Sequence, residues 1–207
     1  MPAPPELEYV LHTIAQTAVD REKEFGDLDA VVGDGDFGYS LARGFENVLS
    51  EWDGYDRADA ATLLQKVALT ISKRVGGTSG PIWGTAFLRA SVSAKGKDEL
   101  TRADVVAMLR AAIEGIKARG KSDVGDKTLL DALVPMTDAI EAATGQDAAS
   151  VAAAAATAAR TSADATAAMQ AMRGRASYAG ERSIGSPDAG AVGVAVMAEQ
   201  VATGWPH

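Results

Sequence analysis

The 207-residue sequence predicts an all-α protein of eight helices, folded as a single domain over residues 1–207. Two observations support this prediction. Apolar residues recur at spacings of three and four along most of the chain, which is the periodicity of amphipathic helices. Glycine, proline and capping residues fall between the apolar segments, where helices begin and end. Hydrophobic residues make up 47% of the sequence and charged residues 23%, as is ordinary for one globular domain.

The first four helices follow from this spacing. Apolar residues in phase predict helices over 7–18, 41–52 and 64–75. A fourth helix is predicted to begin at Pro81, because proline is favoured at the first helical position, and to run through Leu88.

The next two helices combine the same spacing with specific boundary residues. Thr101 and Asp104 form a pattern typical of a capping box, and they predict a helix that continues over 105–116. Apolar residues over 129–140 predict the sixth helix, kinked or shifted at Pro135 because proline breaks the helical hydrogen-bond pattern.

The last two helices are less obvious from periodicity. The segment 147–172 is dominated by alanine, and we expect a helix rather than a low-complexity linker, because alanine is the strongest helix former. Pro187 and Asp188 begin a final helix that runs through Val201. Its valines alone could indicate a strand, but its length and alanine content favour a helix.

The composition argues against several classes of protein. The sequence has no cysteine, which excludes disulfides and thiolate metal sites and fits a cytoplasmic location. The N-terminal segment lacks the basic start and the continuous apolar run of a signal peptide. No apolar run reaches the ~18 residues that a membrane-spanning helix needs. A net charge of −8 without a basic stripe predicts that the protein does not bind nucleic acid.

The charges are divided unevenly along the chain. Residues 1–60 contain 14 acidic and 4 basic residues, whereas residues 61–207 contain 14 acidic and 16 basic residues. The acidic part suits cations and the slightly basic part suits anions. This division predicts a site where a metal ion meets a phosphate.

Three loops rich in glycine, serine or threonine each lead into a predicted helix start. They cover residues 29–38, 76–81 and 173–190. Exposed backbone N–H groups at helix starts are natural anion sites. Short connections also use these residue types for turns alone. Three such loops in one chain, one of them rich in aspartate, favour a binding site.

The stretch LDAVVGDGDFGYSLARGF, residues 28–45, carries three aspartates within eight residues, Asp29, Asp34 and Asp36. Carboxylates ~4 Å apart repel by ~4 kcal/mol per pair at an effective dielectric constant of ~20. A solvated loop could hold them apart, but the interleaved glycines permit a tight turn that brings them together. Oxygen ligands suit Mg²⁺ or Ca²⁺ rather than zinc. Phe45 stands where an EF-hand needs glutamate, so an EF-hand is excluded and Mg²⁺ shared with phosphate fits best.

One motif is misleading. Residues 115–122, GIKARGKS, match the P-loop pattern GxxxxGKS, but a P-loop needs a strand before it and a helix directly after it. A helical pattern precedes this segment, so we predict no P-loop, although Gly120 and Lys121 can still lie near a nucleotide. The two histidines, His12 and His207, form no recognisable Ser–His–Asp group, and we predict no residue that acts as a covalent catalyst.

Four blocks of the sequence closely resemble the nucleotide-binding L subunit of dihydroxyacetone kinases and the same module in single-chain, ATP-dependent dihydroxyacetone kinases. The blocks are LDAVVGDGDFG, GGTSGPIWGTAFLRA, GDKTLLDAL and GRASYAGERSIGSPDAGAVG, and together they span nearly the whole chain. The resemblance implies an eight-helix antiparallel up-and-down barrel with a nucleotide site at one end. It implies that Asp29, Asp34 and Asp36 hold two Mg²⁺ ions that bridge the phosphates. The residues that it places around the nucleotide, ADP or ATP, are Phe37, Gly38, Tyr39, Ser40, Thr78, Ser79, Gly120, Leu129, Arg175, Asp188, Ala189 and Gly190.

The resemblance also implies an activity and partners. The expected protein is a kinase subunit that transfers a phosphoryl group, through bound ADP, from a phosphocarrier protein to dihydroxyacetone. A separate K-type subunit would hold the dihydroxyacetone, and an M-type phosphohistidine carrier would supply the phosphoryl group; a homodimer is left open. The alternatives are an ATP-dependent kinase for dihydroxyacetone or another short ketose, and a non-enzymatic nucleotide-sensing regulator.

Phe37 departs from the family pattern, which commonly has histidine or cysteine at this position, and it leaves the phosphoryl donor open. A chain from Met1 to His207 without an attached K domain favours the phosphocarrier system, in which ADP stays bound. We expect the 173–190 loop to bury the nucleotide and Phe37 to pack over the site.

Overall fold

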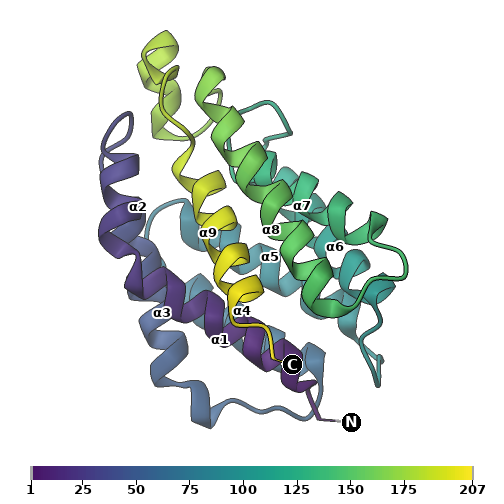
Figure 1. The fold of residues 1–207 in the computed structure, drawn as a ribbon. Coiled ribbons are helices and arrows are strands. Elements are labelled where there is room, and N and C mark those ends of the chain that lie inside the picture. Colours follow the sequence, from purple (N-terminus) through teal and green to yellow (C-terminus); the bar gives the residue numbers. More distant parts are fainter. Residues whose placement is uncertain (1, 207) are drawn as a thin grey trace.

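The computed structural model describes residues 2–206. Within these residues it contains α-helices and short 3₁₀ segments and no strand, as predicted for an all-α protein (Figure 1). In chain order the elements are α1 (Pro5–Asp20), α2 (Glu22–Asp29), α3 (Phe37–Ser50), η1 (Trp52–Gly54), α4 (Ala60–Arg74), α5 (Ser79–Ala94), α6 (Arg102–Gly120), α7 (Leu130–Ala142), α8 (Ala148–Ala165), η2 (Thr166–Ala168), η3 (Arg175–Ser183) and α9 (Ala189–Thr203).

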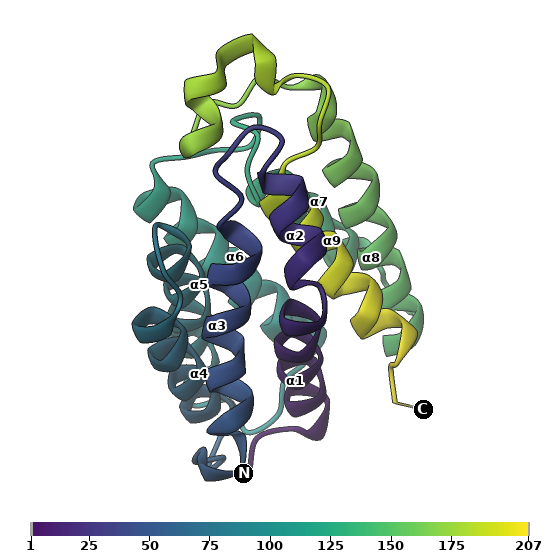
Figure 2. The ribbon, with the colours of Figure 1, turned by 90° about the vertical axis from the view of Figure 1, so that its left-hand side faces the viewer.

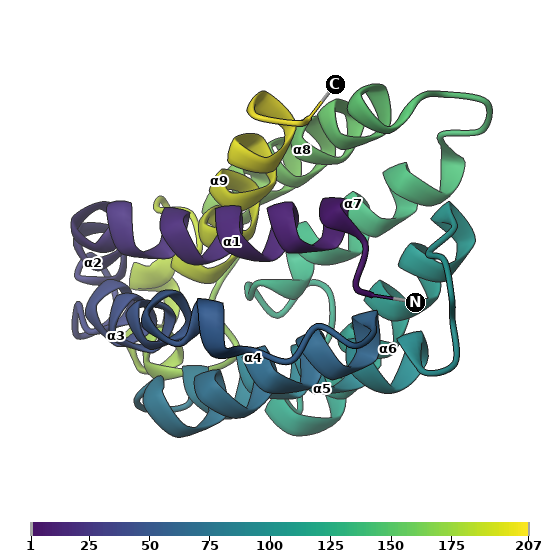
Figure 3. The ribbon, with the colours of Figure 1, turned by 90° about the horizontal axis from the view of Figure 1, so that it is seen from below.

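The helices form a ring of antiparallel rods. α1 and α2 follow one another in the same direction and are separated only by Arg21, whose φ of −104° and ψ of 16° interrupt the helix. With these two counted as one rod, the described residues form the eight rods of the predicted barrel. Successive rods alternate in direction and pack side by side, and α9 returns against α1 (Figures 1 and 2). Figure 3 shows α8 and α9 on one side of α1 and α3 to α6 on the other.

Capping side chains explain where several helices begin. The Thr101 hydroxyl accepts a hydrogen bond from the Asp104 N–H, and the Asp104 carboxylate accepts one from the Thr101 N–H, so the predicted capping box is confirmed. Asp147 caps α8 by accepting from the Ser150 N–H at 2.8 Å. Each bond satisfies a backbone donor that has no partner within its helix.

One helix was missed by the sequence analysis. α2 is eight residues long, and Phe25 is its one buried residue, so it has no periodic apolar pattern to detect. It extends the first rod by two turns and carries Asp29 at its last position. The end of α2 therefore places the acidic loop at the end of the barrel.

The boundaries of α5 and of the alanine-rich helix also differ from the predictions, and α7 shows how Pro135 is accommodated. α5 begins at Ser79, which makes Pro81 the third helical residue, still within the first turn where N–H groups have no helical partner. α7 continues through Pro135 as one helix. The α-helix of the alanine-rich segment ends at Ala165, because the chain tightens into η2 at Thr166, a fully buried residue whose hydroxyl donates to the Ala163 carbonyl.

The interior of the ring is filled by aliphatic and aromatic side chains from most of the rods. The largest fully buried apolar side chains are Phe25, Leu41, Phe45, Val48, Leu63, Val67, Ile71, Ile116 and Leu130. On α8 the buried residues are alanines, Ala155, Ala156, Ala159 and Ala163, whose small side chains let neighbouring helices approach closely. The alanine-rich segment is thus part of the core. Across residues 2–206, no helix is both long enough and apolar enough to cross a membrane.

Candidate functional site

The predicted site residues gather at one end of the barrel. Because the rods alternate, α3, α5, α7 and α9 all begin at this end, and α2 and α6 end there (Figure 2). A Cβ built on Gly76 would lie 3.3 Å from the Ser40 Oγ, so the starts of α3 and α5 are adjacent. A Cβ on Gly190 would lie 3.4 Å from the backbone nitrogen of Leu129, so the starts of α7 and α9 are adjacent too. The three loops singled out in the sequence, 29–38, 76–81 and 173–190, therefore all lead into helix starts at this end.

The three aspartates of the acidic loop converge. One carboxylate oxygen from each of Asp29, Asp34 and Asp36 lies within 4.8 Å of the other two. Gly33 makes this possible, because a Cβ there would lie 2.3 Å from the Asp29 Oδ1. Gly35 turns the chain with a φ of 76°, in the left-handed region that favours glycine. An oxygen-only donor set of this size fits Mg²⁺.

The electrostatics of the cluster favour a cation. Burial raises the pKa of the Asp29 carboxyl above its ordinary value, and the Asp34 and Asp36 charges add to this; the hydrogen bond from the Phe37 N–H acts in the opposite direction. The Arg175 guanidinium bridges the other two carboxylates, with Nη1 at 2.5 Å from the Asp34 Oδ1 and 2.7 Å from the Asp36 Oδ2. Hydrogen bonds to Asp36 and Asp34 raise the pKa of Arg175. A positive charge is thus already positioned at the carboxylates.

Arg175 lies on the long connection between α8 and α9. The sequence analysis treated residues 173–190 as a loop, and the structure forms η3 within it, interrupted at Gly180 with a φ of 57° and a ψ of −131°. Between this segment and the acidic loop lies an open hollow of about 380 Å³. Its lining residues are Val31, Val32, Gly33, Arg175, Tyr178, Ala179 and Arg182. The hollow has the chemistry for an anion, since Arg175 and Arg182 line it.

Helix starts supply further anion-binding groups. Thr78 is exposed and stands at the N-cap of α5 without a side-chain capping bond, which leaves its hydroxyl available, and Ser79 is the first residue of that helix. Tyr39 and Ser40 lie in the first turn of α3, and Tyr39 is 59% exposed. Unpaired N–H groups of such first turns attract phosphates.

Two predicted residues have a structural role visible in their packing. Gly38 is buried, and a Cβ there would lie 2.0 Å from the Glu22 carbonyl oxygen, so α2 and α3 approach too closely for any other residue. The Phe37 ring lies 6.0 Å from the Phe25 ring, and the Gly193 position faces it from α9. Phe37 therefore packs between α2, α3 and α9, as part of the apolar interior, where we had expected it to cover the site.

The remaining predicted residues border the same end. Gly120 is the last residue of α6, and a Cβ there would lie 3.2 Å from the Ile82 Cδ1 in the first turn of α5. Leu129 is the N-cap of α7. Asp188 caps α9 by accepting from the Ala191 N–H at 2.7 Å, and Ala189 and Gly190 form the first turn of that helix. The P-loop match fails as expected, since its residues 115–120 are helical.

Sequence reasoning missed two charged residues beside the site. Lys127 and Asp131 are 2% and 3% exposed, on the connection to α7 and in its first turn. Burial lowers the pKa of Lys127, while burial raises the pKa of the nearby Asp188 to about 7. Both missed residues belong to the block GDKTLLDAL, but nothing in their spacing indicates that they are buried.

The chain is similar to known proteins in both sequence and fold. The sequence profile of the DAK2 domain matches residues 31–203. The chain is 37% identical over 177 residues, 84% of each protein, to the "PEP-dependent dihydroxyacetone kinase, ADP-binding subunit DhaL" of Escherichia coli. It is 38% identical over 193 residues to the L-erythrulose 1-kinase of Mycolicibacterium smegmatis, of which it spans 33%.

A solved structure has the same fold. The dihydroxyacetone kinase of C. freundii, in complex with AMP-PNP and Mg²⁺, superposes with a TM-score of 0.79 and 25% sequence identity. The superposition covers 98% of this chain and 34% of the kinase chain, so this protein spans about a third of that enzyme. With a domain profile that matches most of its length and a relative 37% identical over 84% of both proteins, the chain belongs to the DAK2 domain family.

Proposed function

We propose that this protein is the nucleotide-binding subunit of a dihydroxyacetone kinase. It would bind ADP with Mg²⁺ and pass a phosphoryl group from a phosphocarrier protein to dihydroxyacetone held on a separate K-type subunit. The observation that carries the proposal is the convergence of three carboxylates within 4.8 Å, two of them bridged by Arg175, at the end of the barrel where four helices begin. The E. coli relative, whose name specifies an ADP-binding subunit of a PEP-dependent kinase, supports it.

The residues divide into cation-binding and anion-binding groups. Asp29, Asp34 and Asp36 would hold two Mg²⁺ ions, which neutralise phosphate charge when bound. Arg175, which pairs with Asp34 and Asp36 in this structure, would turn to the phosphates once cations occupy the carboxylates. Thr78, Ser79 and the first turns of α3 and α9 would donate hydrogen bonds to the nucleotide. The chain's contribution is positioning and charge neutralisation, as is general for phosphoryl transfer.

Removing one carboxylate tests the site. Isothermal calorimetry with ADP and Mg²⁺ is expected to give saturable binding to the wild-type protein and none to Asp34→Ala. Asp53→Ala is the matched control, because Asp53 belongs to the same acidic part of the chain but lies in η1, after the end of α3 that is remote from the site. Equal affinities of the wild-type and Asp34→Ala proteins for ADP would refute the assignment of the metal site.

The phosphoryl donor is tested by what the purified protein retains. The phosphocarrier system requires ADP to stay bound, so protein purified without added nucleotide should release stoichiometric ADP when denatured. Turnover of dihydroxyacetone should then need both a K-type subunit and an M-type phosphohistidine carrier. A cytoplasmic location accords with such partners and with the absence of cysteine.

A second candidate is the nucleotide-binding part of an ATP-dependent kinase for a short ketose. The observation that favours it is the 38% identity to an L-erythrulose 1-kinase, as high as the identity to the PEP-dependent relative. In this case the purified site would hold no nucleotide, would exchange ATP quickly, and would support turnover with ATP and a K-type partner alone. Assays with dihydroxyacetone and erythrulose as alternative acceptors identify the ketose.

A further inference from the structure

We propose that Lys127 is a positioning residue that closes the neck of the 169–186 loop and thereby holds Arg175 over the carboxylates. The loop connects η2 to the start of α9 and includes η3. The consequence for nucleotide binding rests on the function proposed above. The proposal that Lys127 closes the neck of the loop rests only on contacts within the chain.

The Lys127 side chain bridges the two legs of this loop. Its Nζ donates to the Met169 carbonyl oxygen at 3.1 Å on the first leg. On the second leg it donates to the Ser186 carbonyl oxygen at 2.7 Å and to the Ser183 carbonyl oxygen. An ammonium group has three donors, and here each has a backbone acceptor. Because Lys127 is 2% exposed, water cannot readily replace these three acceptors. Separating the legs would therefore leave a buried charge without partners.

Other bonds at the neck run between the same two legs. The Ala171 N–H donates to the Ser183 hydroxyl at 2.8 Å, and the Gly185 N–H donates to the Ala167 carbonyl oxygen at 2.8 Å. These bonds tie the loop to itself. Lys127 differs from them because it lies outside the loop and anchors both legs to the body of the barrel.

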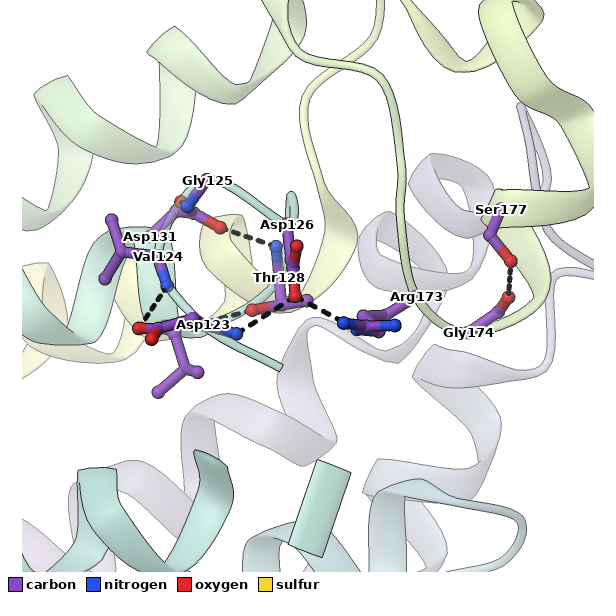
Figure 4. Close-up of polar contacts among 10 residues, drawn as sticks. Asp123, Val124, Gly125, Asp126, Thr128, Asp131, Arg173, Gly174 and Ser177 are labelled. Carbon is purple, nitrogen blue, oxygen red and sulfur yellow. Dashed lines mark hydrogen bonds and ion pairs between the residues drawn. The ribbon is translucent and has the colours of Figure 1, made fainter. Parts of the chain in front are cut away.

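The segment that carries Lys127 is itself held firmly. Figure 4 shows the network: the buried Asp131 carboxylate accepts from the Gly125 N–H at 2.6 Å and from the Thr128 N–H at 2.7 Å. Asp126, the neighbour of Lys127, forms an ion pair with Arg173 at 3.0 Å. Lys127 has a φ of 61°, a conformation that glycine adopts more easily than lysine does. A lysine in this conformation is explained by the bonds that its side chain makes.

The tip of the loop has little packing of its own to hold it. Tyr178 is 87% exposed, and Arg175 reaches the rest of the protein through its ion pairs with Asp34 and Asp36. Such ion pairs are weak when solvent-exposed. The position of the Arg175 guanidinium therefore depends on how the loop is anchored, by the buried bonds of Lys127 at the neck and by the bond from the Met172 N–H to the Asp126 carbonyl oxygen at 3.0 Å.

The experiment compares Lys127→Met with the wild-type protein in two measurements. In nucleotide-free protein, backbone amides of residues 169–186 should exchange hydrogen faster in the variant, while amides of α4 and α5 should not. Affinity for Mg²⁺–ADP should fall about ten-fold or more. In an Arg175→Ala background, the same change should lower the affinity less than three-fold, because the residue to be positioned is gone. Such non-additivity would not follow from general destabilisation.

Two further variants keep the test decisive. Val48→Ala removes fully buried side-chain volume in α3 and should lower the melting temperature without changing nucleotide affinity. Ser183→Ala removes one neck bond and should act in the same direction as Lys127→Met but more weakly, which provides the readout if Lys127→Met does not fold.

Three results would overturn the inference. The first is hydrogen exchange of the backbone amides of residues 169–186 that is as slow in Lys127→Met and in Ser183→Ala as in the wild-type protein. The second is an unchanged Mg²⁺–ADP affinity of a folded Lys127→Met protein. The third is a loss of affinity on Lys127→Met that is equally large in the Arg175→Ala background. A wild-type protein that binds no Mg²⁺–ADP would refute the proposed function instead. The exchange measurement would still decide whether Lys127 closes the loop.

Discussion

Replacing Gly38 with alanine should destabilise the fold at the junction of α2 and α3. A Cβ at this position would lie 2.0 Å from the Glu22 carbonyl oxygen and 2.5 Å from the Gly26 backbone nitrogen. Both atoms belong to the backbone of α2, so no side-chain rotation can relieve the overlap and the two helices must separate. Overpacking of this kind costs ~1–3 kcal/mol. For a chain of this size the melting temperature should fall by roughly 2–12 °C.

The same separation should weaken the proposed metal site. Asp29 is the last residue of α2, whereas Asp36 directly precedes α3, so moving one helix displaces their carboxylates relative to each other. Thermal unfolding of nucleotide-free protein measures the first effect, and calorimetry with Mg²⁺–ADP measures the second. Gly54→Ala is the matched control, because a Cβ there would meet no atom within 4 Å. An unchanged melting temperature with lost nucleotide affinity would refute the packing argument and make Gly38 a nucleotide contact.

Two other predictions test the caps. Thr101→Ala removes the capping box of α6, which lies at the end of the barrel opposite the site. This change should lower the free energy of unfolding by ~0.5–2 kcal/mol without changing the affinity for Mg²⁺–ADP. Any loss of affinity would contradict the separation of the two ends. Asp188→Asn keeps an oxygen that can cap α9 but removes a carboxyl whose pKa burial raises from 3.8 to about 7. Because the folded state binds this proton more tightly than the unfolded state, the wild-type protein should lose stability relative to Asp188→Asn as the pH rises from about 4 to about 7. Denaturant unfolding across this range checks it, and parallel pH profiles would contradict it.

The sequence predicted the barrel well because most rods carry a periodic apolar pattern. It also predicted that the three aspartates come together, because the glycines between them permit a tight turn. It failed where the signal is not local. α2 has a single buried residue, Phe25, and its position depends on packing against α3 and α9. The position of Phe37 next to the acidic loop in the sequence indicates a site residue, but its ring packs against the Phe25 ring of the neighbouring helix.

Lys127 shows most clearly what local sequence patterns cannot predict. Lysine is among the residues that are rarely buried, so its local sequence indicates a surface position. Its three acceptors lie 42 to 59 residues away along the chain. They come within reach only when the connection between α8 and α9 folds back over the end of the barrel, which no short-range pattern encodes.

Because α9 packs against α1, the ring of helices is closed, and the fold does not require α1 to come first in the chain. The Tyr9 hydroxyl near the start of α1 donates to the Val201 carbonyl oxygen at 2.9 Å, and the Tyr9 and Trp205 rings are 5.9 Å apart, so the C-terminal segment packs against the first part of α1 on the side remote from the site. A linker could join the N-terminal segment to the C-terminal segment on this side, and the chain could be reopened between α3 and α4 at that same side. Such a circular permutant would keep every helix start at the same rim, because the cyclic order and the direction of each rod would be unchanged.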